Sequence, residues 1–181
     1  MEERLVKVGI THGDINGIGY EVILKTLSDT RIAELCTPVI YGSSKIAAYH
    51  RKVLELPAVN LSIIAQAEDA GANRVNIINC VDDETKVELC QSTTAAGEAV
   101  TDLKRGAVDV LVTAPINKHN IQNEQFHFPG HTEYLEQCFG GLGKKALMIL
   151  MKDNLRVALV TGHIPLAQVA SKITVEDIVY F

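Results

Sequence analysis

The amino-acid sequence predicts an α/β fold with a largely parallel sheet and helices on both faces of that sheet. Strand-like and helix-like segments alternate over most of the 181 residues, and several strand-like segments are short runs of apolar side chains. Such alternation is typical of strand–helix–strand units, and apolar runs are typical of strands that are buried on both faces. The composition, 47% apolar and 22% charged, is that of one ordinary globular domain or of part of a larger unit.

The first two strands are each followed by a helix. Residues 6–11 alternate and are β-branched, which predicts a strand, and a glycine-rich turn leads from it into a helix. The apolar positions of this helix are Ile18, Val22, Ile23 and Leu27. Residues 38–42 predict a second strand, and Ser43 or Ser44 caps a helix that runs towards Leu56. The apolar positions near one face of the second helix are Ile46, Tyr49, Val53 and Leu54.

The middle of the chain continues this alternation. Two short strands are expected at residues 61–65 and 74–79. Residues 92–105 place small and apolar side chains at helical spacing, and Gly106 is a suitable stop. The next strand is expected at residues 108–113, so these segments extend the parallel sheet.

The last third of the chain begins with a long connection. Residues 118–130 are mostly polar and irregular, as is typical of connections that carry function. A helix begins at Thr132, and two later apolar runs, at residues 146–151 and 157–161, are expected to pair as an antiparallel hairpin. Thr174 and the two acidic residues that follow it predict a capped helix start.

This final helix start stands seven residues before the last residue, Phe181. A helix that short is marginal without packing. It is either a short docked terminal helix or the beginning of a longer segment. We favour the second reading and expect a truncated front portion of a two-domain protein, which enters its second domain after about residue 118. The pair Tyr180 and Phe181 is then expected to lack its native cover.

Charge and hydropathy exclude two classes of partner. Seventeen Lys and Arg against 22 Asp and Glu give a net charge of −5, without the basic block that binds nucleic acid. The longest apolar run, residues 146–151, is far shorter than the roughly 20 residues that span a bilayer, and residues 1–10 lack the apolar stretch of a signal peptide. We expect a cytoplasmic protein with neither a nucleic-acid nor a membrane partner.

Two loops that follow strands carry candidate catalytic residues. The glycines of residues 11–19 permit tight turns, although their spacing is not that of a G-x-G-x-x-G loop. In this loop Asp14 either orients a substrate group or bonds backbone amides within the turn. Lys118 follows a strand at the edge where open α/β sheets bind ligands, and can pair with a carboxylate or phosphate. A lone Lys in a loop is, however, usually only solvated.

Two further segments carry candidate binding residues. His131 and Thr132, at a helix start, offer a donor and acceptor pair to a small polar ligand, unless Thr132 is only a cap and His131 a surface residue. His163 ends a strand of buried type, where a neutral imidazole can ligate a metal. A catalytic divalent ion needs about three protein ligands, so the others must come from elsewhere.

In combination, these segments resemble a known family. In chain order they read ITHGDINGIGYE, LVTAPINKHNI, FPGHTEYLE and RVALVTGHIPL. They are similar to the signature blocks of the 4-hydroxythreonine-4-phosphate dehydrogenase family of vitamin B6 biosynthesis. The blocks span residues 10–166, and GHTE followed by T-x-H-x-P is the most specific combination among them.

The resemblance implies a fold like that of isocitrate and isopropylmalate dehydrogenases and a homodimer with its active site near the interface. It also implies NAD or NADP and a divalent metal (zinc, magnesium or cobalt). The implied reaction oxidises a small phosphorylated hydroxy-amino acid, 4-phosphooxy-L-threonine, to a 3-keto acid that decarboxylates to 3-amino-2-oxopropyl phosphate. A metal on the alcohol oxygen would ease hydride departure.

The resemblance also implies roles for residues. His131 and Thr132 match the substrate-binding pair of the family, and His163 matches the first of its three metal-binding histidines. Asp14 and Lys118 lie in matching blocks, and we interpret them as candidate catalytic residues.

This chain also departs from the family pattern. His12, Asn16 and Tyr20 stand where the family often has Pro, Ala and Pro, and family members are longer, with two further metal histidines downstream. Three alternatives therefore stay open. They are a related dehydrogenase of 4-phospho-threonate or of a dihydrodiol, a phosphate acyltransferase-like enzyme, and a non-catalytic phosphate-binding module.

Overall fold

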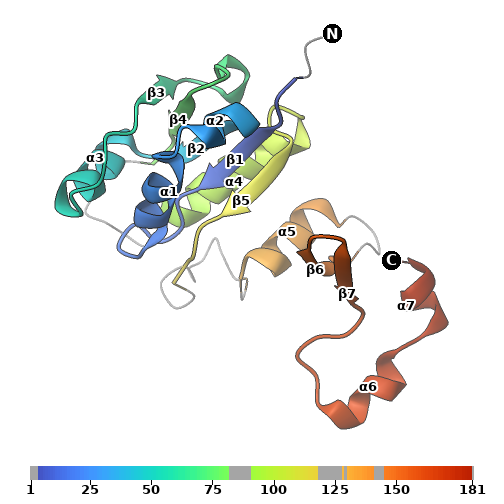
Figure 1. Cartoon of the computed structure of the whole chain (residues 1–181). Helices are drawn as coiled ribbons and strands as arrows, with labels where there is room; N and C mark the ends of the chain where they lie inside the picture. Colours follow the sequence, from blue (N-terminus) through green and yellow to red (C-terminus); the bar gives the residue numbers. More distant parts are fainter. Residues whose placement is uncertain (1–3, 82–90, 118–127, 129, 141–144, 181) are drawn as a thin grey trace. The chain divides into compact units, whose positions relative to one another are not determined.

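The computed structural model describes residues 4–81, 91–117, 128, 130–140 and 145–180. The chain divides into two compact units, the first ending at His131 and the second beginning at Thr132. The first unit contains a five-stranded sheet and the second a two-stranded sheet (Figure 1). In the described part of the chain, no helix has the length and apolar character needed to cross a membrane.

The sheet of the first unit is entirely parallel, as predicted. Its strands are β1 (Lys7–Thr11), β2 (Thr37–Gly42), β3 (Leu61–Ile64), β4 (Val75–Asn79) and β5 (Val110–Thr113). They lie in the order β3-β4-β2-β1-β5. The helices of this unit are α1 (Gly19–Leu27), α2 (Arg31–Leu35), α3 (Ser44–Val53), α4 (Gln91–Lys104) and the 3-10 helix η1 (Ala67–Asp69). The predicted alternation of strands and helices is therefore confirmed.

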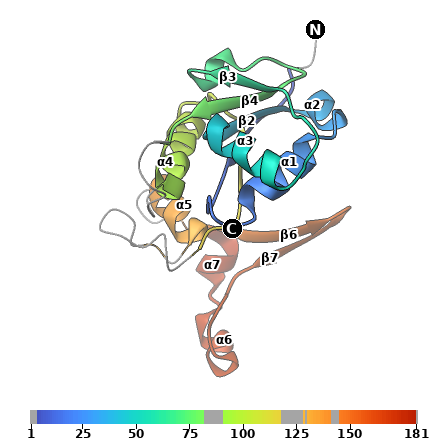
Figure 2. The same ribbon diagram turned by 90° about the vertical axis from the view of Figure 1, so that its left-hand side faces the viewer.

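Helices cover both faces of this sheet. In β2, Tyr41 packs in a cluster with residues of α4, whereas the preceding Ile40 packs with Ile23 and Leu27 of α1. Successive side chains of a strand point to opposite faces, so α4 covers one face and α1 the other (Figure 2). Helix α3 lies beside α1 and packs against it through Ala47. The predicted placement of helices on both faces of the sheet is confirmed.

The core face of α1 differs from the prediction. Ile23 and Leu27 are buried as expected, but Ile18 and Val22 are exposed. Tyr20 and Leu24 complete the buried face instead, at the i, i+3, i+4 and i+7 positions of an amphipathic helix. Because the helix begins at Gly19, Ile18 lies outside it.

Helix α3 begins as predicted and buries a different face. The hydroxyl of Ser43 accepts a hydrogen bond from the Ile46 N–H at 3.2 Å, which confirms Ser43 as the cap. The helix ends at Val53, short of Leu56. Ala47 is its buried residue, whereas the predicted apolar positions are half-buried or exposed. Their exposure leaves an apolar surface beside the sheet.

Helix α4 ends at Lys104, just before the predicted stop at Gly106. Gly106 has a positive φ of 76°, and its N–H donates to the carbonyl of Leu103 at 3.2 Å, which caps the helix. Under this helix the buried Tyr41 donates its hydroxyl hydrogen to Asp102 at 2.6 Å. Burial raises the pKa of Tyr41 far above its usual range, so this hydroxyl stays protonated.

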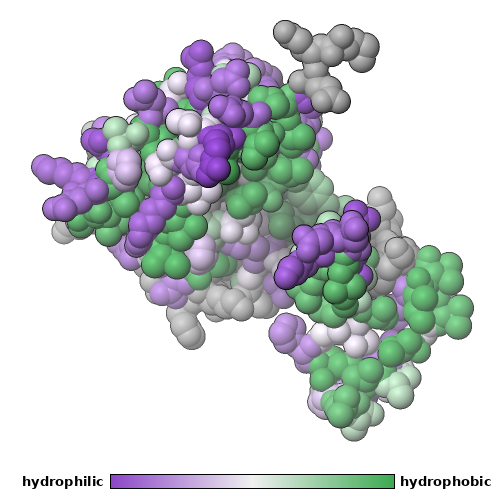
Figure 3. All heavy atoms as spheres, in the orientation of Figure 1, coloured by the Kyte–Doolittle hydropathy of each residue, from purple (hydrophilic) through white to green (hydrophobic). Residues whose placement is uncertain are grey.

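The second unit forms the predicted hairpin, but its burial was predicted wrongly. Its elements are α5 (His131–Phe139, which starts at the boundary), β6 (Met148–Lys152), β7 (Leu155–Leu159), α6 (Leu166–Lys172) and α7 (Val175–Tyr180). Strands β6 and β7 pair antiparallel. Every residue of both strands is exposed, which contradicts a strand of buried type at residues 157–161. Apolar side chains are visible on the surface of the second unit (Figure 3).

The end of the second unit keeps its predicted cap. The Asp177 N–H donates to the hydroxyl of Thr174 at 3.0 Å, and that hydroxyl donates to the Asp177 carboxylate at 2.7 Å. Val179 in the last turn is 78% exposed. The side chains of Tyr180 and Phe181 lie outside the described residues, so their expected lack of cover stays a prediction.

Candidate functional site

The sheet of the first unit has a switch point between β1 and β5. From β1 the chain passes through α1 and α2 to β2 on one side, and much later through α4 to β5 on the other side. Loops that leave the carboxyl ends of two such strands diverge, and ligands of open α/β sheets bind in the resulting crevice. Residues 12–18 after β1 and residues 114–117 after β5 therefore form the candidate site.

Backbone contacts join these two loops. The Asp14 N–H donates to the carbonyl of Pro115 at 2.9 Å, and the Ala114 N–H donates to the carbonyl of Thr11 at 3.1 Å. Between them Gly13 has a positive φ of 71°, and a Cβ at this position would lie 2.3 Å from the Pro115 oxygen. Glycine is therefore required at residue 13 for both its backbone angle and its close approach.

Asp14 shapes the turn that follows β1. Its carboxylate accepts a hydrogen bond from the Asn16 N–H at 3.0 Å, and its carbonyl accepts one from the Gly17 N–H at 3.0 Å. These contacts show the turn-forming role that was one of its two predicted readings. The side chain is half-buried at the switch point, and its catalytic role stays a prediction.

Three stacked rings connect this loop to α1 and α3, and sequence reasoning did not single them out as a unit. Tyr20 stacks on His12 on one side and on His50 on the other, with a ring-centroid distance of 5.4 Å in each pair. We call His12, Tyr20 and His50 the ring column. The three residues come from the β1–α1 loop, α1 and α3 and share no periodicity. The one signal in the sequence was that His12 and Tyr20 replace residues common in the family.

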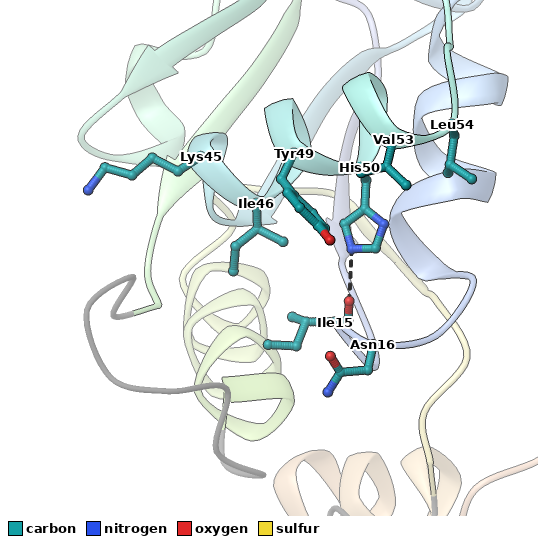
Figure 4. Close-up of a pocket in the computed structure, with 8 residues that line it drawn as sticks. All are labelled: Ile15, Asn16, Lys45, Ile46, Tyr49, His50, Val53 and Leu54. Carbon is teal, nitrogen blue, oxygen red and sulfur yellow. Dashed lines mark hydrogen bonds between the residues drawn. The ribbon is translucent and has the colours of Figure 1, made fainter.

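A pocket opens beside the loop, between it and α3. Its volume is about 500 Å³. The pocket is lined by Ile15, Asn16, Lys45, Ile46, Tyr49, His50, Val53 and Leu54 (Figure 4). The apolar positions that were expected to be the packed face of α3 thus form one wall of an open hollow.

The other predicted site residues fall in different places. Lys118 lies outside the described residues, which end at Asn117 on this side of the gap. His131 is half-buried at the start of α5, and burial lowers the pKa of its imidazole below the usual range. The ring is therefore neutral at pH 7, with one N–H to donate and one nitrogen to accept. Thr132, the next residue of the helix, is exposed.

His163 does not stand at the end of a strand. Strand β7 ends at Leu159, and His163 lies in the segment that leads to α6, exposed and with a positive φ of 55°. The expected position was wrong because the apolar run extends past the residues that pair. In the described ranges no group of three His, Cys, Asp or Glu side chains is close enough together to hold a metal ion.

Comparisons with known proteins point to one family. Residues 34–181 match the model of the pyridoxal phosphate biosynthetic protein PdxA. A 4-hydroxythreonine-4-phosphate dehydrogenase of Bacteroides thetaiotaomicron is 56% identical over 97% of this chain and 50% of its own length. One of Sulfurihydrogenibium is 37% identical over 97% of this chain and 55% of its own length.

A solved structure agrees with these sequence matches. The crystal structure of a 4-hydroxythreonine-4-phosphate dehydrogenase from Burkholderia phymatum superposes with a TM-score of 0.81 at 26% identity, over 94% of this chain and 54% of its own. The predicted fold class is therefore confirmed. This chain spans about half the length of the curated relatives it matches.

Proposed function

This chain belongs to the family of the pyridoxal phosphate biosynthetic protein PdxA, and we propose that it forms part of a dehydrogenase that acts on 4-phosphooxy-L-threonine. The reaction removes a hydride and a proton from a secondary alcohol and leaves a 3-keto acid. Loss of carbon dioxide from that acid gives 3-amino-2-oxopropyl phosphate, a step towards vitamin B6. The observation that carries this proposal is 56% identity over 97% of the chain to a relative named for this substrate.

Within this proposal, the residues of the chain bind and orient the substrate. The neutral imidazole of His131 and the hydroxyl of Thr132 supply hydrogen bonds to its polar groups without adding charge. Asp14, held at the switch point by its turn, orients the reacting end. Lys118, which follows β5 after four loop residues, pairs with a carboxylate or phosphate of the substrate.

The proposed hydride acceptor is NAD or NADP, and the proposed metal is a divalent ion. The loop after β1 lacks the spacing of a dinucleotide-binding glycine loop. We therefore assign no described residue to the cofactor. His163 is one candidate metal ligand, but the described residues bring no two other ligand side chains to it.

Binding measured on the chain itself tests this function. Calorimetry with 4-phosphooxy-L-threonine should show binding that His131→Ala and Thr132→Val each weaken about tenfold, the value of one or two hydrogen bonds to a charged ligand. Thr101→Val is the matched control, because Thr101 is also an exposed helical threonine and its hydroxyl donates to the carbonyl of Gly97 in its own helix. Binding that is absent, or equal for 4-phospho-threonate, would contradict the proposed substrate.

Turnover is a separate readout. We expect slow formation of NADH or NADPH and weak affinity for zinc, magnesium or cobalt, because His163 has no group of companion ligands among the described residues. Rapid turnover by the chain alone would show that ligands outside these residues complete the site. The proposal also includes a cytoplasmic location and a homodimer with its site near the interface. Sedimentation with and without substrate would test the homodimer.

A further inference from the structure

We infer that Tyr20 and His50 are positioning residues, which hold the loop of residues 12–18 in the shape that the switch point requires. This inference rests on the proposed function, since the loop carries Asp14. It concerns the ring column defined above. Neither residue is proposed to touch substrate or cofactor.

His50 contacts the loop directly. Its Nε2 donates to the carbonyl of Ile15 at 2.9 Å, and Figure 4 shows the imidazole reaching from α3 towards that carbonyl. Ile15 itself is buried and packs with Tyr20, Leu24 and Ala47. The middle of the loop is therefore fixed to α3 by the His50 bond, and the Asp14 bond to Pro115 fixes it to the segment after β5.

Tyr20 connects the loop to the end of β2. Its ring is fully buried, and its hydroxyl accepts a hydrogen bond from the Ser43 N–H at 2.8 Å. Ser43 is the residue that caps α3, so one phenol oxygen joins α1 to the start of the helix that carries His50. The planes of the three rings lie within 13° and 17° of parallel, so the column is continuous.

Because Gly42 has no side chain, the ring column has room at the end of β2. A Cβ at this position would lie 2.4 Å from the Tyr20 hydroxyl oxygen and 3.2 Å from the His12 ring. Any other residue at the end of β2 would therefore displace the tyrosine. The close approach shows that the column depends on the sheet as well as on the two helices.

The physical consequence is a loop held on two sides. The Asn16 side chain is exposed at its crown, and Asp14 is half-buried beside it. A loop of this kind samples many shapes unless backbone groups are fixed, and each fixed group lowers the cost of ordering it on binding. Loss of the His50 bond should therefore weaken ligand binding without disturbing the sheet.

Hydrogen exchange of the full 181-residue chain tests this inference. His50→Leu removes the bond to Ile15, and Tyr20→Phe keeps the stacked ring but removes the bond to Ser43. Each should speed amide exchange of residues 13–19 about tenfold or more, the effect expected for loss of one hydrogen bond in a local opening. His50→Gln, whose amide can still donate to Ile15, should restore most of the protection.

Tyr41→Phe is the matched control. Tyr41 is as buried as Tyr20, but its hydroxyl donates to Asp102 of α4, on the other face of the sheet. This change should leave the exchange of residues 13–19 within about twofold of the parent chain, because the loop keeps all its contacts. Equal acceleration in Tyr41→Phe and Tyr20→Phe, or no acceleration in His50→Leu, would overturn the inference.

Ligand binding separates this inference from the proposed function. With 4-phosphooxy-L-threonine as the probe, His50→Leu should raise the dissociation constant about tenfold and His50→Gln should recover it. If the parent chain does not bind the probe, the proposed function fails, and the exchange data still decide whether the column holds the loop. If His50→Leu loosens the loop but binds the probe as well as the parent chain, the link to ligand binding is overturned.

Discussion

The two units of this chain reach regular structure with very different amounts of burial. In the unit that ends at His131, strand β2 is buried along all six residues and three apolar clusters fill the space around the sheet. In the unit from Thr132 onward, β6 and β7 are exposed along their whole length and α6 has no buried residue. Helices and strands thus arise from local sequence, whereas burial depends on what the rest of the molecule supplies.

The largest expected effect comes from removing core volume. Leu24 is 1% exposed and Leu150 is 59% exposed. Leu24→Ala should lower the free energy of unfolding by about 2–5 kcal/mol, through lost burial and a residual cavity. Leu150→Ala should change it by less than about 0.5 kcal/mol. Urea unfolding followed by circular dichroism measures both, and similar losses would mean that β6 is covered in solution.

Substitution of glycines should give the next largest difference in stability between the two units. Gly13→Ala combines a positive φ with a Cβ that would meet the Pro115 oxygen, and should cost about 2 kcal/mol or more. A Cβ at Gly162, in the second unit, would meet nothing within 4 Å, so Gly162→Ala should stay within about 0.5 kcal/mol of neutral. Thermal unfolding is the measurement. A neutral Gly13→Ala would show that the loop has another shape.

Helix caps should behave alike in the two units, because a cap is a local interaction. Ser43→Ala and Thr174→Ala each remove a hydroxyl that accepts a backbone N–H at a helix start, and each should destabilise its helix by about 1 kcal/mol. Hydrogen exchange of the first turns of α3 and α7 reports the two losses separately. Protection that falls in α3 alone would indicate that α7 does not form in solution.

The smallest expected effect is the pH dependence from His131. Burial lowers the pKa of this imidazole in the folded chain below its ordinary value of 6.5. The unfolded chain therefore binds more protons at acid pH, so the stabilising contribution of neutral His131 is complete above pH 6.5 and is lost as the pH falls through the lowered pKa. Unfolding measured from pH 7.5 to 5 should show a shallower decline in His131→Gln. An NMR titration with a ring pKa above 6.5 would contradict this prediction.

Much of the first unit was predictable because its signals are local. The Ser43 cap and the Gly106 stop were predicted from single residues and confirmed, and the strands followed from apolar runs. Ile18 was assigned to a helix that begins only at Gly19, and Val22 was assigned to the buried face that Tyr20 and Leu24 occupy instead.

The candidate site was predictable only in part. A loop after a β-strand is readable from sequence, so Asp14 was correctly placed in the turn that follows the first strand. The contact between Tyr20 and His50 joins two helices across 30 residues of chain, and no periodic pattern in the sequence predicts it. His163 was misplaced for a related reason, since an apolar run does not show where strand pairing stops.

The central position of β1 has a consequence for synthesis on the ribosome. Val8 of β1 pairs with Pro38 of β2 on one side and with Val110 of β5 on the other. During translation the first strand made therefore keeps one edge unpaired until residues 110–113 have been synthesised. An unpaired strand edge is a template for pairing with other chains, so the nascent protein is exposed to aggregation in that interval.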